Sequence, residues 1–269
     1  MARSIPDAIR ELCLSFPDAE QVLSHGKPGY AVRGKFFAYY TVNHHGDGRV
    51  ALLVNAPAGV QAACVKAEPR HYFIPPYVGP RGWLGINLDR GIAWRRVVAH
   101  ARDAWLKVAP AKLAARLDAT DIDVKPPTSQ KLKPAEIDPL QSARGRRLLA
   151  ALRRACGELP DVTEDTQFGH PVWRAGKKIF ARAWHHDDRF TAVFWVGVPA
   201  QALMLRDPRY LLPPYFGPSG WIALDASKRV NAAELRALAL ESYRHFATKR
   251  MLARLGEDVD ASVSVTDGA

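Results

Sequence analysis

A twelve-residue stretch occurs twice in this chain, and it constrains the fold more than any other feature. The sequence YFIPPYVGPRGW covers residues 72–83, YLLPPYFGPSGW covers residues 210–221, and eight of the twelve positions are identical. Proline fixes φ and lacks an N–H group, so adjacent prolines followed by G-P-x-G form neither a helix nor a central strand. Each stretch is therefore predicted to be a shaped loop.

The similarity between the two halves extends far beyond this loop. Residues 16–18 and 35–37 correspond to residues 159–161 and 178–180 at a shift of 143, and from the loop to the end of each copy the shift is 138. Repeats of this kind indicate a duplicated structural unit. The predicted organisation is a first unit over residues 1–117, a proline-rich linker over 118–141, a second unit over 142–255 and an acidic, flexible tail over 256–269.

The pattern within each copy predicts an α+β unit. Apolar residues recur at helical spacing from Ile5 to Phe16 and again from Trp94 to Val108, and the second copy has counterparts of both helices. Between them, KFFAYYTV and VALLVN are joined by HHGDGR, which is typical of a β-hairpin. Strands linked by hairpins and flanked by helices predict an antiparallel sheet packed against helices.

The charge is concentrated in the two copies. The chain carries +11 overall; residues 1–118 hold 16 Lys/Arg against 9 Asp/Glu, residues 146–255 hold 18 against 10, and the tail holds only acids. A basic surface favours a polyanionic partner, although an arginine-rich codon usage produces the same composition. Cys13, Cys64 and Cys156 have no paired spacing and are expected to be free thiols. With no apolar run near 18 residues and no signal-peptide core, we expect a cytoplasmic protein without a membrane partner.

These motifs together resemble one family. A helix, a G-x-P strand, a hairpin, the P-P-Y-x-G-x-x-G-W loop and a final helix with Ser242-Tyr243 before Lys249-Arg250-Met251 are similar to the MmcQ/YjbR family. The first copy departs from that ending, with Ala104-Trp105 and Ala111-Lys112-Leu113. The resemblance implies two tandem CyaY-like units, whereas members of the family normally have one. It also implies DNA binding through a double wing of β-hairpins.

Basic residues near the turns are the candidate phosphate contacts. They surround the first hairpin turn of each copy, precede or lie in the repeated loop, or follow the final helix: Lys27, Arg33, Lys35, Arg70, Arg81, Arg174, Lys177, Lys178, Arg209, Lys249 and Arg250. The alternative is ordinary solvated charge. No recognition helix is evident, so we expect contacts to the phosphates of nucleic acid, most simply duplex DNA, with little sequence preference.

The aromatic residues of the repeated loop allow two interpretations. Tyr77, Trp83, Tyr215 and Trp221 either seal the edge of each core or line a groove that stacks bases or a small planar ligand. The second interpretation keeps open a small-molecule-binding or sequestering protein that uses these loops and a groove between the units. A protein that serves only as an interaction scaffold is a third class.

No catalytic, cofactor or metal motif stands out. The sequence has no G-x-S-x-G, H-E-x-x-H or phosphate-binding glycine loop. Two histidine pairs, 44–45 and 185–186, are placed at equivalent hairpin tips beside aspartates. Adjacent strand residues point to opposite faces, however, and no third ligand is apparent. The chain is therefore predicted to be non-enzymatic, without cofactor or metal.

Overall fold

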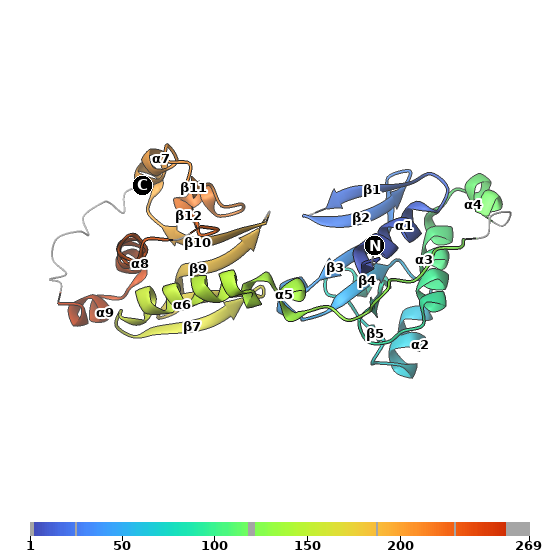
Figure 1. Ribbon diagram of the computed structural model, residues 1–269, viewed down its shortest axis with the longest axis horizontal. Coiled ribbons are helices and arrows are strands. Elements are labelled where there is room, and N and C mark those ends of the chain that lie inside the picture. The colour runs from blue at the N-terminus through green and yellow to red at the C-terminus, as the bar shows by residue number, and fades with distance from the viewer. Residues whose placement is uncertain (1–2, 25, 118–121, 187, 229, 257–269) are drawn as a thin grey trace, which may run out of the picture. The chain divides into compact units, whose positions relative to one another are not determined.

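The structure of the protein is a computed structural model that describes residues 3–24, 26–117, 122–186, 188–228 and 230–256. The chain divides into two compact units, residues 1–137 and residues 138–269 (Figure 1). In the described ranges no helix has both the length and the apolar composition that a bilayer crossing requires.

Unit 1 contains an antiparallel six-stranded sheet in the order β1-β2-β3-β4-β6-β5. Its elements are α1 (Ile5–Leu14), β1 (Ala19–Ser24), β2 (Lys27–Val32), β3 (Lys35–Val42), the 3₁₀ turn η1 (His44–Gly46), β4 (Val50–Val54), α2 (Val60–Ala67), β5 (Tyr72–Phe73), η2 (Gly79–Arg81), β6 (Leu84–Asn87), α3 (Trp94–Val108), α4 (Ala111–Leu117) and α5 (Pro134–Ile137).

Unit 2 repeats this arrangement, with the sheet order β11-β12-β10-β9-β8-β7. Its elements are η3 (Pro139–Gln141), α6 (Ala143–Gly157), β7 (Val162–Gln167), β8 (His170–Ala175), β9 (Lys178–His186), β10 (Arg189–Trp195), α7 (Val198–Met204), β11 (Tyr210–Leu211), η4 (Gly217–Ser219), β12 (Trp221–Asp225), α8 (Ala232–Phe246) and α9 (Lys249–Arg254). Even the irregularity of the second strand recurs, because the register shifts at Tyr30/Ala31 and again at Trp173/Arg174. The predicted α+β class and the two tandem units are confirmed.

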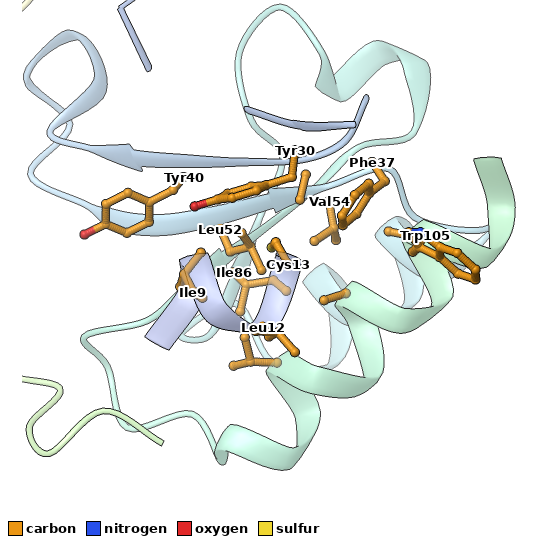
Figure 2. Packing of buried hydrophobic residues seen from close by; sticks show 14 of the residues in the cluster. Ile9, Leu12, Cys13, Tyr30, Phe37, Tyr40, Leu52, Val54, Ile86 and Trp105 are labelled. Carbon is orange, nitrogen blue, oxygen red and sulfur yellow. The ribbon is translucent and has the colours of Figure 1, made fainter. Parts of the chain in front are cut away.

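One face of each sheet is covered by the first and the last long helix of its unit. Figure 2 shows Ile9, Leu12 and Cys13 of α1 and Trp105 of α3 beneath the strands of unit 1, and all four are completely buried. Helix α1 begins where the sequence predicts it, because the Ser4 side chain accepts a hydrogen bond from the N–H of Asp7. In unit 2, α6 and α8 take the same places, and Leu152 and Tyr243 are buried there.

The opposite face of each sheet carries the repeated loop, and we call it the loop face. Alternate strand residues point to it. In unit 1 it includes Tyr39, Leu53, Phe73 and Trp83, and Val78 of the loop packs against the same cluster. In unit 2 the register places Arg182, Val193, Leu211 and Trp221 at the matching positions.

The segment expected to be a linker belongs largely to the units. From residue 122 to 137 it packs on unit 1: Val124 is buried and its carbonyl accepts a hydrogen bond from the Trp94 indole N–H at 2.7 Å. The backbone of Thr128 donates to Arg3 at 2.9 Å. Residues 138–141 begin unit 2, where Leu140 is buried. The boundary is therefore at 137/138, whereas the prediction placed a linker over 118–141. Of the tail predicted over 256–269, residues 257–269 lie outside the described residues.

Three local features differ from the expectations. The polar segments of β1 and β7 are strands, which hydrophobic alternation does not reveal, because four of the six residues of each are exposed. The repeated loop is not wholly irregular: residues 72–73 and 210–211 form short edge strands. The histidine pairs are not equivalent, since residues 44–45 lie in η1 and residues 185–186 end β9.

Candidate functional site

The repeated loop holds one tyrosine in an unusual backbone conformation in each unit. Tyr77 has φ +63° and Tyr215 has φ +69°, and their exposed fractions are 66% and 80%. Left-handed φ values cost an L-residue roughly 1–2 kcal/mol, so the surrounding loop must impose them. The loop therefore presents an aromatic side chain to solvent at the same position twice.

A glutamine, half-buried in unit 1 and buried in unit 2, fixes the loop in both units. The side-chain amide of Gln61 donates to the carbonyl oxygens of Gly79 at 2.8 Å and Trp83 at 2.6 Å. Gln201 makes the same two bonds, at 2.7 and 2.6 Å. Sequence reasoning missed this pair, although a signal exists. The glutamines match at a shift of 140, between the 143 and 138 of the flanking segments.

The two tryptophans of the loop pack against their own unit. Trp83 is 7% exposed and packs with Ala51 and Leu53, while its ring lies 5.2 Å from that of Tyr39. Trp221 is half-buried and stacks on Phe246 at 5.6 Å. Of the four aromatic residues predicted to stack on a ligand, only the two tyrosines are exposed.

In unit 1 the exposed tyrosine borders a cluster of basic side chains at the β3–β4 turn. The rings of His45 and Tyr77 lie 5.5 Å apart, and Lys27 contacts the His44 ring. Burial lowers the pKa of Lys27 to about 8, an effect that Asp47 partly opposes. Burial and the positive charge of Lys27 lower the pKa of His44 to about 4. Lys27 is therefore engaged inside the protein, unlike an exposed phosphate contact.

Four of the predicted phosphate contacts are paired with carboxylates. The shortest distances are 2.6 Å for Arg33–Asp18, 2.9 Å for Arg174–Asp165, 2.7 Å for Arg209–Asp207 and 4.0 Å for Arg250–Asp161. Arg209 also contacts Glu234 at 2.9 Å. These cations are already partly neutralised. The sequence could not show this, because strand pairing and helix packing bring most of the partners together rather than a spacing pattern.

The remaining predicted cations are exposed, and no carboxylate among the described residues forms an ion pair with them: Lys35, Arg70, Arg81, Lys177, Lys178 and Lys249. Because Ala38 pairs with Val54 and Val54 with Leu84, the β2–β3 turn lies at the same end of the sheet as residues 81–83. The structure thus brings Lys35 and Arg81 to one end of unit 1, which we call the turn end. Arg70, whose carbonyl is bound by Asn87, lies at the other end.

The turn end of unit 2 is also basic. Lys177 and Lys178 form the β8–β9 turn, and β7 begins beside it because Val162 pairs with Ala175. Lys249 opens α9, a helix that is attached to the same end through ion pairs with Asp161. Each unit therefore combines exposed cations at its turn end with an exposed tyrosine on the repeated loop. Within the described residues, no group of three metal-ligating side chains is close enough to hold an ion.

Comparisons with known proteins give the family. The family model described as YjbR matches residues 14–107 and 157–245, which together make up more than half of the chain. The search of curated proteins found no match. Among solved structures, the chain is similar to Deinococcus radiodurans protein DR2400, which contains the family-model domain DUF419. The identity is 20%, the coverage is 44% of this chain and 94% of that one, and the TM-score is 0.35. The two regions matched by the family model each contain one copy of the hairpins and the repeated loop, so the chain belongs to the YjbR family as two tandem copies.

Proposed function

We propose that this protein is a non-enzymatic nucleic-acid-binding protein with little sequence preference. The observation that carries the proposal is the pair of exposed tyrosines, Tyr77 and Tyr215, held at positive φ on the same loop of both units. An exposed aromatic ring makes few packing contacts that offset the strain of its backbone. Stacking on a nucleic-acid base would be a function for such a ring. It contributes about 1–3 kcal/mol of binding free energy per base in proteins that bind single strands.

Exposed cations supply the electrostatic part of the proposed interaction. Lys35 and Arg81 in unit 1, and Lys177, Lys178 and Lys249 in unit 2, lie at the turn ends and have no carboxylate partner among the described residues. The length of the eight-residue strand β3 is about 26 Å at roughly 3.3 Å per residue, so the turn end and the β3–β4 turn can be contacted by one extended strand of a few nucleotides.

Low sequence preference follows from the same chemistry. Phosphates and the faces of bases are shared by all sequences, whereas base edges carry the sequence information. Non-specific binding of this kind has dissociation constants on the order of 10⁻⁴–10⁻⁶ M at physiological salt. A reducing compartment, the cytoplasm, is part of the proposal, because Cys13, Cys64 and Cys156 are all free thiols.

Fluorescence anisotropy of a labelled mixed-sequence single strand and of its duplex, titrated with the full chain, tests the proposal. In the variant K177E/K178E we expect weaker binding to both forms and a salt slope that is flatter by about one per lost phosphate contact. The matched control K131E/K133E makes the same change in net charge on exposed residues outside both family-matched regions. It should have a much smaller effect.

The variant Y77S/Y215S separates stacking from charge. We expect it to weaken single-strand binding roughly tenfold or more, which corresponds to about 1–3 kcal/mol per base, and to affect the duplex less. Lack of binding to either form near about 50 mM salt, where such electrostatic contacts are strong, would refute the proposal.

A further inference from the structure

The loop face of unit 2 contains a pocket that the exposed tyrosines and the turn-end cations do not use. It has a volume of about 420 Å³ and lies between the strands β9, β10 and β12 and the first residues of the repeated loop. Its lining includes Trp184, Arg189, Thr191, Leu211, Pro213 and Ala223. Pockets for small ligands range upward from about 300 Å³, so this volume suits a ligand of one or two rings.

Unit 1 shows what fills the same place. Phe73 pairs with Gly85 as Leu211 pairs with Ala223, so the two pairs are equivalent in register. The Phe73 ring lies directly against Gly85 of the neighbouring strand β6, because a Cβ atom added to Gly85 would be 2.4 Å from ring atoms of Phe73. In unit 1 an aromatic ring of the protein itself therefore occupies this part of the loop face.

An arginine covers that ring. The guanidinium carbon of Arg49 lies 4.1 Å from the centroid of the Phe73 ring, within the range of a cation–π interaction. The Arg49 side chain is held by a hydrogen bond to Asn87 at 3.3 Å. Ring, glycine and arginine together form a closed stack in unit 1.

Unit 2 keeps the arginine and lacks the ring. Arg189 occupies the position of Arg49 and contacts Asp225, the counterpart of Asn87, at 3.5 Å. The ring is replaced by Leu211, and Trp184 adds an aromatic wall where unit 1 has Thr41. A cation, an aromatic wall and a hollow of ring size are thus left in place of a filled stack.

We propose that this pocket binds one planar heteroaromatic ring, seated beside Arg189 and Trp184 where unit 1 holds Phe73. Such a ring comes either from a free nucleoside or from an unpaired base of a nucleic-acid strand. Only the second source rests on the function proposed above. Because Arg189 is paired with Asp225, the pocket selects the ring rather than a negative charge.

The test uses the full chain, with adenosine and cytidine as probes and ribose 5-phosphate as a ligand without a ring. Saturation-transfer NMR should detect both nucleosides and not the sugar phosphate. The variant L211F/A223G copies the filling of unit 1 into unit 2 and should weaken nucleoside binding at least tenfold, with duplex binding unchanged. An unchanged melting temperature, or the single variant L211F if the double variant melts early, shows that the fold is retained.

If a single-stranded oligonucleotide displaces adenosine, the natural occupant is an unpaired base of a nucleic-acid strand. If adenosine stays bound at a saturating oligonucleotide concentration, the occupant is a free nucleoside. If anisotropy shows no nucleic-acid binding but adenosine still binds, the proposed function is refuted and the ring-binding pocket is supported. The ring-binding proposal is overturned if neither nucleoside binds at millimolar concentration. It is also overturned if L211F/A223G binds the nucleosides as tightly as the wild-type chain.

Discussion

The side-chain amide nitrogen of Gln201 lies 2.6 Å from the carbonyl oxygen of Trp221. Gln201 is only 7% exposed, so this bond and its companion to Gly217 are largely shielded from water. A glutamine on a helix thus ties together the 3₁₀ turn of the repeated loop and the start of β12. Gln61 makes the same two bonds in unit 1, so this link is a shared feature of the two copies.

Removing this link should destabilise unit 2. Gln201→Leu keeps the approximate size of the side chain but leaves two carbonyl oxygens without their donor, and we expect the free energy of unfolding to fall by about 1–3 kcal/mol. Urea denaturation followed by tryptophan fluorescence measures the change. Gln21→Leu, at an exposed position of the edge strand β1, is the control. Equal effects of the two substitutions would show that the buried bonds contribute little.

Two equivalent glycines should respond differently to alanine. Gly82 and Gly220 have φ +84° and +86°, but a Cβ atom at Gly82 would meet nothing within 4 Å, whereas one at Gly220 would lie 2.8 Å from the Cα atom of Gly197. Gly82→Ala should cost about 1–2 kcal/mol, the strain of the left-handed conformation. Gly220→Ala should cost about 1–3 kcal/mol more, because the backbone of the neighbouring segment must move. Thermal unfolding that shows similar losses would contradict the clash.

Truncation of the loop tryptophans should also destabilise the two units by different amounts. Trp83 is 7% exposed, and Trp83→Ala is expected to lower the free energy of unfolding by about 3–5 kcal/mol. Trp221 is less deeply buried, so Trp221→Ala should cost less. Chemical denaturation checks the order. If Trp83→Ala left stability unchanged and abolished nucleic-acid binding, this tryptophan would be a contact to the partner instead of a structural residue.

His44 should titrate far below the ordinary range for histidine. Its folded-state pKa is about 4, because of burial and the neighbouring Lys27, and the value for an unfolded chain is near 6.5. The unfolded state therefore binds more protons between these values. The contribution of His44 to stability is complete above about pH 6.5 and is lost as the pH falls toward 4.

The NMR signals of the His44 ring measure this titration directly. They should remain those of the neutral form at pH 5.5, and Lys27→Met, which removes the neighbouring charge, should move the midpoint upward. The drop in unfolding free energy between pH 7 and pH 5 should be smaller in His44→Asn than in the wild-type chain. A midpoint near 6.5 would mean that the ring is solvated and not engaged with Lys27.

Much of the fold could be predicted because its signals are local. The spacing of Ile9, Leu12 and the residues around them requires one buried helix face, and the repeated motifs require two copies of one unit. The strand β1 could not be predicted, because it is polar and exists through its pairing with β2. The packing of residues 122–137 on unit 1 could not be predicted for a similar reason: it depends on contacts such as that between Thr128 and Arg3, which are 125 residues apart.

The candidate site was less predictable than the fold. The sequence indicates which residues are basic but not which of them already have a partner, as in the pair Arg33–Asp18 or the pair Arg209–Glu234. It also cannot distinguish the buried Trp83 from the exposed Tyr77 within one loop, since both are aromatic and occupy shared positions. That difference is produced by the left-handed backbone at residue 77, which turns the tyrosine outward.

The attachment of residues 122–137 to unit 1 determines where the chain can be divided. A fragment that ends at residue 117, the end of the recognisable repeat, would lose Val124 from its core and the acceptor of the Trp94 indole N–H. A fragment that ends at residue 137 keeps both. Unit 1 is thus longer than the recognisable repeat, because residues 122–137 complete its packing.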